Sequence, residues 1–387
     1  MKVLMISTDR RIFEADSEVR GRMLEYGALA EELHIIVLSQ KSKVKSQNSV
    51  ADPKAQKLAE NIFAYPTNSR RRLMYIWDAV RIGREIIRDF GFRVNDSLIT
   101  AQDPFETGLA GYFLKCLTGV RLQVQMHTDF LSPYFVAESR LNWLRVRIAK
   151  LVIPRADALR AVSVRIKERV VAEFGLREEK IAVLTVFVDV KNIQNAEVRA
   201  DLHKKYPQFD FLAFTAARIT REKNLGLLLQ ALVEMNARGR GVGLVIVGDG
   251  PELANLKQKA RDLQLEGSVY FEPWSEDLVS YYKTADAFVL ASNYEGYGRT
   301  IVEACAAECP VVMTDVGLAG ELIVDGVNGL VVPVGDSTAL REAILRLVAS
   351  PNLATRLAKN ARSAVFGFPD KATYLARYRA GWEACLE

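Results

Sequence analysis

Short apolar runs rich in β-branched residues alternate with stretches of helical periodicity from one end of this sequence to the other. Such alternation is typical of parallel β-sheets covered by helices on both faces. The runs predict strands at 2–7, 34–39, 62–65, 97–101, 121–126, 158–163 and 181–186, and again at 211–216, 243–247, 268–272, 287–291, 310–314 and 329–332. Two sets of six or seven strands indicate an α/β protein with two doubly wound domains.

The length of 387 residues also fits two domains, at roughly 100 to 200 residues each. A polar stretch at 189–210 separates the two sets of strands, so we expect an N-terminal domain at 1–190 and a C-terminal domain at 191–365. A break containing glycine and proline precedes a last aromatic-rich stretch. We expect residues 366–387 to form a final helix that packs back on the N-terminal domain.

Composition and charge exclude several classes of protein. Hydrophobic residues make up 49% and charged residues 26%, and no apolar run approaches the roughly 18 residues of a membrane span. Residues 1–7 are too short, and too soon followed by Asp9 and Arg10, to be a signal peptide, so we expect a cytoplasmic protein.

Residues 1–190 hold 30 basic against 23 acidic side chains, whereas the remainder holds 22 against 24, so an anionic partner would bind the first half. No RNA- or DNA-binding module is recognisable, so nucleic acid is not an expected partner.

The most informative segment, 292–304, follows the strand expected at 287–291 and leads into a helix. Gly296 and Gly298 carry no side chains, so a ligand can approach the backbone where the helix begins, and such helix starts favour phosphate. Glu303 lies one turn inside the helix and suits the paired hydroxyls of a ribose, whereas Glu295 lies before the turn. The alternative interpretation is a tight turn and an ordinary helix cap.

A second cluster lies after the strand expected at 211–216. Arg218, Arg221 and Lys223 would stand at the carboxyl end of this strand, above a helix start, where two or three cations match a diphosphate. The alternative is a solvated basic loop. Both clusters belong to the same edge of the same sheet, which favours the binding-site interpretation.

The glycine turn at 247–252 resembles a dinucleotide-binding fingerprint but has Leu253 in place of the third glycine. We therefore expect a nucleoside to approach the bare backbone at Gly248, with Trp274 close to the base of that nucleoside. The first turn, at 7–11, contains no glycine, so we do not expect an NAD-dependent dehydrogenase.

Three polar residues follow strands in the first half. His127 ends the strand at 121–126, where an imidazole could exchange a proton or bind phosphate, although a lone histidine is more often structural. Asp129 and Asp103 also stand near strand ends and are candidates for binding the hydroxyls of an acceptor.

Glu295 and Glu303, eight positions apart around Gly-Tyr-Gly, resemble the Glu-x7-Glu motif of family 4 glycosyltransferases. Arg218 and Lys223 are similar to the basic pair of that family. The likeness covers 211–350 and includes the segments 317–321 and 328–333. In the first half, His127 and Asp129 are similar to the strand-end histidine of the family and its acidic neighbour.

The resemblance implies a GT-B fold, in which two Rossmann-like domains face each other across a cleft. It implies a UDP- or GDP-linked sugar as donor, held mainly by the second domain, an acceptor held by the first domain, transfer with retention, and no metal. Arg218 and Lys223 would hold the diphosphate, and Glu303 the ribose. The candidate catalytic residues are His127, Glu295, Arg218 and Lys223, the donor-binding residues are Arg218, Lys223, Gly248, Trp274, Glu295, Gly296, Tyr297, Gly298, Arg299, Thr300 and Glu303, and the acceptor-binding residues are Asp103, His127 and Asp129. Many members carry a glycine pair in the first loop, where this chain has Asp9, Arg10 and Arg11, so the share of the first domain in donor binding stays open.

Two basic and aromatic segments raise the question of a membrane surface. The helix expected at 139–152 places Leu141, Leu144, Ile148 and Leu151 on one stripe, with Arg140, Trp143, Arg147 and Lys150 beside it, and a second patch consists of Arg70, Arg71, Arg72, Leu73, Met74, Tyr75 and Trp77. Such helices bind anionic lipid. The slightly favoured alternative is an ordinary helix whose apolar stripe faces the core.

The sequence thus predicts a cytoplasmic glycosyltransferase, peripheral at the inner face of a membrane, that acts on a lipid-linked or glycan acceptor. Two alternatives remain. One is a non-catalytic protein that binds sugar nucleotides, and the other is a sugar-nucleotide epimerase on the same fold.

Overall fold

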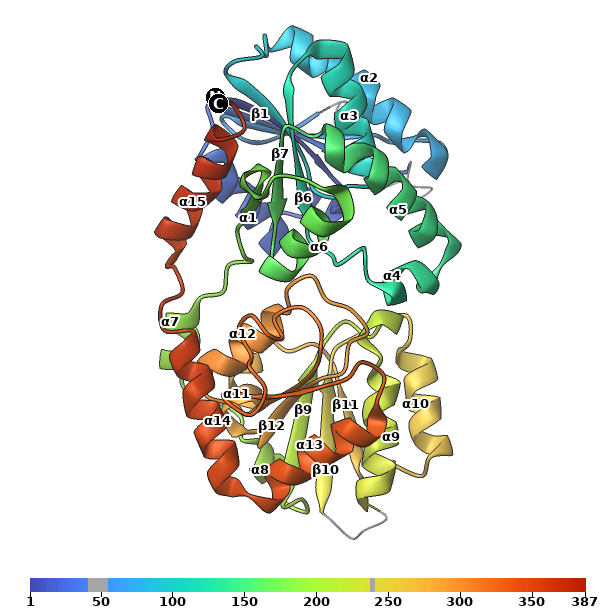
Figure 1. Ribbon diagram of the computed structural model, residues 1–387, viewed down its shortest axis with the longest axis vertical. Helices are drawn as coiled ribbons and strands as arrows, with labels where there is room; N and C mark the ends of the chain where they lie inside the picture. Colours follow the sequence, from blue (N-terminus) through green and yellow to red (C-terminus); the bar gives the residue numbers. More distant parts are fainter. Residues whose placement is uncertain (41–54, 237–240) are drawn as a thin grey trace. The chain divides into compact units, whose positions relative to one another are not determined.

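The computed structural model describes residues 1–40, 55–236 and 241–387, which divide into two compact units (Figure 1). Unit 1 comprises Met1–Leu131, Ser139–Thr185 and Lys371–Glu387. Unit 2 comprises Ser132–Glu138 and Val186–Asp370. The chain therefore passes into unit 2 after Thr185, five residues before the expected boundary. Ser132–Glu138 belongs to unit 2 although its neighbours in sequence belong to unit 1, and Lys371–Glu387 returns to unit 1 as the sequence predicted.

Unit 1 contains an eight-stranded sheet in the order β3-β4-β2-β1-β5-β6-β7-β8. Its strands are β1 (Lys2–Ser7), β2 (Glu32–Val37), β3 (Gln56–Ala59), β4 (Ile62–Pro66), β5 (Ser97–Ala101), β6 (Arg121–Met126), β7 (Ala158–Ala161) and β8 (Ile181–Val183). Its helices are η1 (Arg10–Phe13), α1 (Glu18–Gly27), η2 (Arg72–Met74), α2 (Tyr75–Asp89), α3 (Glu106–Thr118), α5 (Arg140–Val152), η3 (Ile153–Arg155), α6 (Val164–Phe174), η4 (Glu178–Lys180) and α15 (Lys371–Glu383).

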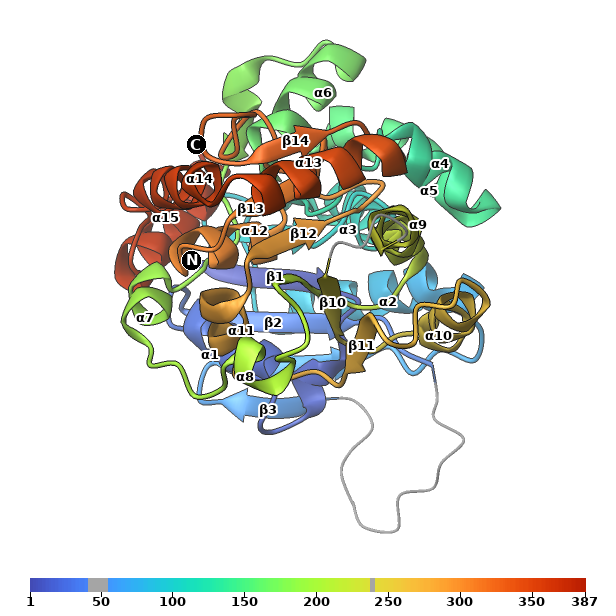
Figure 2. The ribbon, with the colours of Figure 1, turned by 90° about the horizontal axis from the view of Figure 1, so that it is seen from below.

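Helices cover both faces of this sheet. Helices α2, α3 and α5 pack side by side on one face, and α1 and α15 lie on the other (Figures 1 and 2). The inner strands β1, β2 and β5 are largely apolar and almost completely buried, as is typical of parallel strands between two helical layers. The expectation of a wholly parallel sheet is wrong at β3, which pairs antiparallel with β4 at the sheet edge. A polar, half-exposed edge strand carries no apolar run by which the sequence could reveal it.

Unit 2 contains a six-stranded, wholly parallel sheet in the order β11-β10-β9-β12-β13-β14. Its strands are β9 (Phe211–Ala216), β10 (Val242–Val247), β11 (Val269–Glu272), β12 (Ala287–Leu290), β13 (Val311–Thr314) and β14 (Leu330–Val332). Its helices are α4 (Pro133–Glu138), α7 (Val190–Asn195), α8 (Leu202–Lys205), η5 (Arg221–Lys223), α9 (Leu225–Asn236), α10 (Leu253–Asp262), α11 (Leu278–Thr284), α12 (Arg299–Ala306), α13 (Ser337–Ala349) and α14 (Pro351–Ala364). Leucines of α9 and α13 form much of the core on one face of the sheet.

Each sheet has one point at which the strand order reverses. In unit 1 the chain moves outward from β1 to β2 and then returns to β5 on the other side of β1. In unit 2 it moves from β9 to β10 and β11 and returns to β12 beside β9. Ligands of open α/β sheets bind at the carboxyl ends of the strands at such a point. The loops after β9 and β12 are therefore the natural place for a ligand of unit 2.

Candidate functional site

The loops after β9 and β12 bring a lysine and a glutamate together. Lys223 Nζ lies 2.6 Å from Glu295 Oε1, and Ser292 Oγ donates a hydrogen bond to the same oxygen at 2.8 Å. The side chains of Lys223 and Glu295 are only 22% and 12% exposed. Lys223, from the loop after β9, and Glu295, from the loop after β12, thus form a partly buried ion pair at the carboxyl edge of the sheet.

Two asparagines bind these loops to each other. The backbone N–H of Asn293 donates to the carbonyl of Glu222 at 2.7 Å, and the Asn224 amide donates to the side-chain oxygen of Asn293 at 3.0 Å. Asn224 adopts a left-handed conformation with φ of 44°, which asparagine tolerates better than most residues. Sequence reasoning missed both residues, although the asparagine just before α9 is a recognisable signal for such a turn.

Helix α12 begins at this edge. Gly298 is its N-cap, with a left-handed φ of 94°, and Arg299 and Thr300 form its first turn. The first N–H groups of a helix have no partner inside it, and the helix dipole adds a partial positive charge there. Gly296 and Tyr297 are buried. The groups of this turn that could bind an anion are therefore the backbone N–H groups from Gly298 to Thr300.

Both carboxylate oxygens of Glu303 have partners within α11 and α12. Arg299 Nε lies 2.7 Å from Oε1, and the hydroxyl of Tyr282 donates to Oε2 at 3.1 Å. Burial, and next the charge of Glu303, raise the pKa of Tyr282 well above its usual value. The phenol is therefore a permanent donor that orients Glu303, a role for Tyr282 that the sequence did not suggest.

The other candidate cations are less well placed. Arg218 is 75% exposed and lies 3.6 Å from Glu222. Arg221 is 73% exposed and pairs with Glu252 at 3.2 Å. Lys223 is therefore the cation in contact with Glu295, and Arg218 reaches into solvent from the same loop.

Gly248 has a structural reason to be glycine. Its φ is 145°, and a Cβ atom there would lie 2.0 Å from the carbonyl oxygen of Ala217. The loop after β10 thus packs directly on the loop after β9, so the bare backbone accommodates another part of the protein. Trp274, beyond β11, is 59% exposed and available for stacking.

In unit 1, the ring of His127 is exposed and its Nε2 lies 3.0 Å from Gln125 Oε1. Loss of hydration, and next the positive charges of Arg160 and Arg22, lower the pKa of His127 below its usual value. The ring is therefore neutral at physiological pH.

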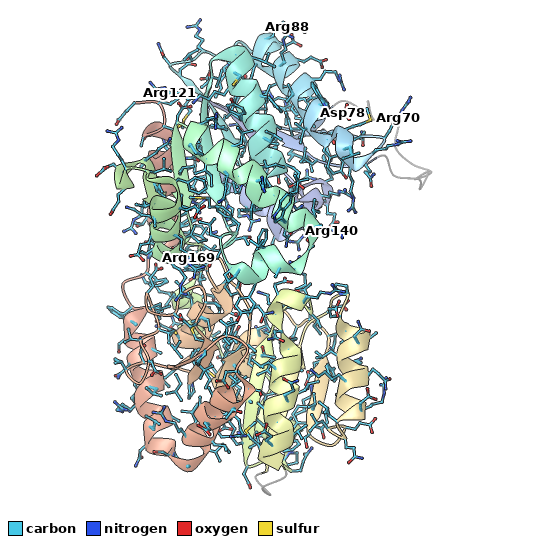
Figure 3. All side chains as sticks on the ribbon, turned by 45° about the vertical axis from the view of Figure 1, so that its right-hand side comes forward. Arg70, Asp78, Arg88, Arg121, Arg140 and Arg169 are labelled. Carbon is cyan, nitrogen blue, oxygen red and sulfur yellow. The ribbon has the colours of Figure 1, made fainter. Side chains whose placement is uncertain are left out.

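The two aspartates predicted to bind an acceptor have partners inside unit 1. Asp129 is buried and forms an ion pair with Arg169, which lies at the lower end of unit 1 in Figure 3. Asp103 Oδ1 accepts hydrogen bonds from the N–H groups of Phe105 at 2.7 Å and Thr107 at 3.3 Å, so it caps α3. Burial, and next the charge of Glu106, raise the pKa of Asp103 to about 6.

In the first loop, Asp9 Oδ1 accepts a hydrogen bond from the backbone N–H of Arg11 at 3.1 Å, and the Arg10 guanidinium donates to the hydroxyl of Tyr75 at 2.9 Å. The loop becomes the short helix η1. Side chains thus fill the region where many family members have glycines, and in this structure they bind unit 1 itself.

Unit 1 also carries an exposed apolar surface beside basic residues. The exposed side chains include Trp77 (74%), Trp143 (50%) and, in addition, Leu73, Met74, Leu141, Leu144 and Leu151. The buried side of α5 instead consists of Asn142, Ala149 and Val152. The interpretation that the leucine stripe of this helix faces the core is therefore wrong, because helical periodicity reveals a stripe but not which side packs on the sheet. Arg70 and Arg140 lie on the same side of unit 1 (Figure 3).

The basic residues of this surface differ in their partners. Arg147 stacks on Trp143 at 4.4 Å, and Lys150 pairs with Glu173 at 2.5 Å. Across the described residues, no helix has the length and apolar character needed to span a bilayer.

Comparison with known proteins gives the site its context. The family model of group 1 glycosyl transferases matches residues 199–364, and that of the glycosyl transferase 4-like domain matches residues 46–186. The chain belongs to the family 4 glycosyltransferases. The first match covers the whole loop region from Arg218 to Glu303, and the second covers most of unit 1.

This family 4 chain is 38% identical over 136 residues to the lipopolysaccharide core biosynthesis glycosyltransferase LpsE of Rhizobium meliloti, which is 35% of this chain and 40% of that protein. It is 28% identical to the alpha-D-kanosaminyltransferase of Streptomyces kanamyceticus, over 65% of this chain and 67% of the relative. The alignments thus span only part of these curated relatives.

Solved structures establish the GT-B fold. A sucrose-phosphate synthase from Thermosynechococcus elongatus superposes with a TM-score of 0.78 at 20% identity, over 99% of this chain and 100% of that one. Anabaena HepE in complex with UDP superposes with a TM-score of 0.72 at 20% identity, with the same coverage.

Proposed function

We propose that this protein is a retaining glycosyltransferase that moves a sugar from a nucleoside diphosphate sugar to a lipid-linked or glycan acceptor. The observation that carries the proposal is the Lys223–Glu295 pair beside the start of α12, at the strand reversal of unit 2. In this proposal Lys223 and Arg218, with the N–H groups of Arg299 and Thr300, hold the diphosphate and stabilise it as it leaves.

The two glutamates then have separate tasks. Glu303, oriented by Tyr282, accepts hydrogen bonds from the ribose hydroxyls, and Glu295 accepts them from the sugar. Ammonium, guanidinium and amide groups supply the positive charge that a metal ion supplies in other transferases, so we predict full activity in the presence of EDTA.

The activities for which related proteins are named support the donor and acceptor classes. Anabaena HepE has been solved with UDP-glucose, and a mannosyltransferase from Mycolicibacterium smegmatis, 28% identical over 56% of this chain, is GDP-mannose-dependent and acts on a phosphatidylinositol mannoside. Alpha-monoglucosyldiacylglycerol synthase from Streptococcus pneumoniae, 28% identical over 62% of this chain, is named for a lipid. We therefore place UDP- and GDP-sugars first among donors.

Thermal stabilisation by nucleotides tests the donor class. The nucleotide that binds the folded protein raises its melting temperature, and we expect UDP or GDP to do so more than ADP or CDP. Release of that nucleotide from the matching sugar donor should then require Glu303 and Lys223. Unchanged release in Glu303→Gln and Lys223→Met would refute the assigned roles. Tight donor binding without transfer or hydrolysis would instead indicate a binding protein, and product formation without an acceptor an epimerase.

We further propose that unit 1 docks on an anionic membrane surface through the exposed side chains of η2, α2 and α5. Arg147 stacks on Trp143, Arg140 begins the same helix, and Arg70 precedes η2 and the exposed Trp77 in the chain. Cations combined with exposed aromatic rings suit acidic headgroups and the acyl boundary. The N-termini of helices in a parallel α/β fold lie at the carboxyl edge of the sheet, so this surface borders the edge where a lipid-linked acceptor would bind.

Flotation with vesicles containing phosphatidylglycerol tests this surface. We expect Trp77→Ser with Trp143→Ser to abolish flotation, and Arg140→Gln with Arg147→Gln to weaken it. The matched control is Phe366→Ser, which changes an 85% exposed aromatic residue of unit 2. Equal flotation of all variants would refute the assignment.

A further inference from the structure

One face of strand β6 is polar although it is buried. Its alternate residues bind helix α15 and the turn that follows it: Arg121 donates to the carbonyl of Cys385, just after the helix, at 3.0 Å, Gln123 to the carbonyl of Gly381 at 2.7 Å, and Gln125 to the hydroxyl of Tyr378 at 3.0 Å. Side chains on one face of a strand are two residues apart, and those on one face of a helix are three or four apart. The residue numbers rise along β6 and fall along its partners, so the two segments run in opposite directions. Arg121 marks the start of this strand in Figure 3.

Gln125, which binds Tyr378, also contacts His127. Gln125 Oε1 accepts a hydrogen bond from the Arg160 guanidinium at 3.0 Å and lies 3.0 Å from His127 Nε2. A guanidinium has no acceptor, so the Gln125 atom that faces it must be the amide oxygen. The oxygen accepts only, so His127 Nε2 must carry the proton of the second hydrogen bond. In a neutral ring, Nδ1 then has the free lone pair.

Arg160 is itself held by α15. It is 5% exposed, donates to the hydroxyl of Tyr374 at 3.2 Å, and lies 4.6 Å from the ring centroid of Tyr378. Tyr378 in turn stacks on Tyr26 of α1 with ring centroids 4.1 Å apart. The amide of Gln125 therefore cannot rotate without breaking buried hydrogen bonds to both sides, and such unpaired groups are costly.

We propose that α15 is a positioning element for His127: through Tyr378 and Arg160 it fixes the Gln125 amide so that His127 presents an unprotonated Nδ1 to the substrate. Such a nitrogen accepts a hydrogen bond from a sugar hydroxyl and disfavours a phosphate oxygen. The inference that a substrate contacts this nitrogen rests on the proposed function, whereas the tautomer itself does not. Gln125, Arg160 and Tyr378 are positioning residues, since they act through His127.

The tautomer can be measured directly, because the chain contains only three histidines, His34, His127 and His203. In the full-length protein labelled with ¹⁵N, His127→Asn assigns the His127 signals by their loss. We expect a neutral ring at pH 7.5 with the proton on Nε2. A proton on Nδ1, or protonation of the ring near neutral pH, would overturn the proposal, whether or not the protein transfers a sugar.

Two variants of the amide then separate positioning from stability. Gln125→Leu should lower kcat/KM roughly 10- to 100-fold by freeing the ring, because small misplacements of such groups have effects of that order. Gln125→Glu keeps the acceptor but adds a charge that favours the imidazolium, so kcat/KM should acquire an acid limb that the natural protein lacks. An unchanged pH profile in this variant would count against the proposal.

The matched control is Gln123→Leu. Gln123 lies on the same strand face, is also buried, and also binds α15, but it has no contact with His127. We expect this variant to lose thermal stability while keeping the natural pH profile and the Nε2 tautomer. If Gln123→Leu changes the pH profile as much as Gln125→Glu does, α15 acts only as a structural support and the proposal is wrong. Absence of donor turnover in the natural protein would refute the proposed function and leave the tautomer result intact.

Discussion

Neutralising Glu295 should strengthen the binding of the free nucleoside diphosphate, although the same change should impair sugar transfer. In the free protein the ammonium of Lys223 already has an anionic partner, Glu295 Oε1, at 2.6 Å. A diphosphate that binds Lys223 must share this cation with the carboxylate. Glu295→Gln removes the competing charge but keeps an oxygen that can accept hydrogen bonds from the sugar.

The distance sets the size of the effect. A phosphate oxygen at an ordinary charge-assisted hydrogen-bond length from Lys223 would lie about 5 Å from Glu295 Oε1. Two unit charges at that separation repel by about 3 kcal/mol at an effective dielectric constant of about 20, and by about 1 kcal/mol in bulk water. Because the side chains of Lys223 and Glu295 are only 22% and 12% exposed, the effect lies between these two values, which corresponds to a decrease in Kd of at least about fivefold.

Lys223→Met should have the opposite effect. It removes a hydrogen bond to a charged group, worth about 1.5–3 kcal/mol, and leaves Glu295 facing the phosphates, so Kd should rise at least tenfold. Isothermal titration calorimetry with UDP or GDP measures both variants, and Lys257→Met on α10, an exposed lysine far along the chain from either loop, is the control. If Glu295→Gln weakens nucleotide binding as Lys223→Met does, the two residues do not compete for the diphosphate and the geometry has been misread.

Two further predictions concern stability. Gly248→Ala should lower the melting temperature of unit 2 strongly, by the equivalent of about 3 kcal/mol or more, because the new Cβ would lie 2.0 Å from the Ala217 carbonyl, whereas Gly267→Ala, with no atom within 4 Å of its Cβ, should be tolerated in the same calorimetric scan. For Asp103 the pKa is raised from 3.8 to about 6 in the folded state, so its contribution to stability is greatest below pH 3.8 and is lost as the pH rises through 6. Asp103→Asn, which keeps the capping oxygen, should therefore melt higher than the natural protein at pH 7.5 and equally at pH 4, and the reverse order would contradict the burial argument.

The chemistry of the edge in unit 2 could be predicted from sequence because it is local. Strand-end position alone places Lys223 and Glu295 on one edge, since parallel strands finish together. What fixes their orientation could not be predicted in this way. The hydroxyl of Ser292 donates to Glu295, and that of Tyr282 orients the neighbouring Glu303, but serines and tyrosines occur throughout the chain.

The roles of the polar residues of unit 1 could not be predicted from the sequence, for two physical reasons. Asp103 and Asp129 follow strands just as a ligand-binding carboxylate would, and only the coordinates show that one caps a helix and the other pairs with Arg169. Buried polar side chains such as Gln125 give a clear signal in the pattern of β6, where they alternate with apolar residues inside an otherwise internal strand. That signal indicates a polar partner but cannot identify a helix more than 200 residues later in the sequence, since no local rule links the two.

The late position of α15 in the sequence has a consequence for biosynthesis. Arg160 and Gln125 leave the ribosome long before Tyr374 and Tyr378, and Val186–Asp370 of unit 2 is made in between. At ~5–20 residues per second, that interval lasts roughly 10 to 40 seconds. Throughout it the side chains of Arg160 and Gln125 lack their hydrogen-bond partners on α15, and such unpaired polar groups are costly when buried. Folding of unit 1 is therefore completed only after α15 has been translated.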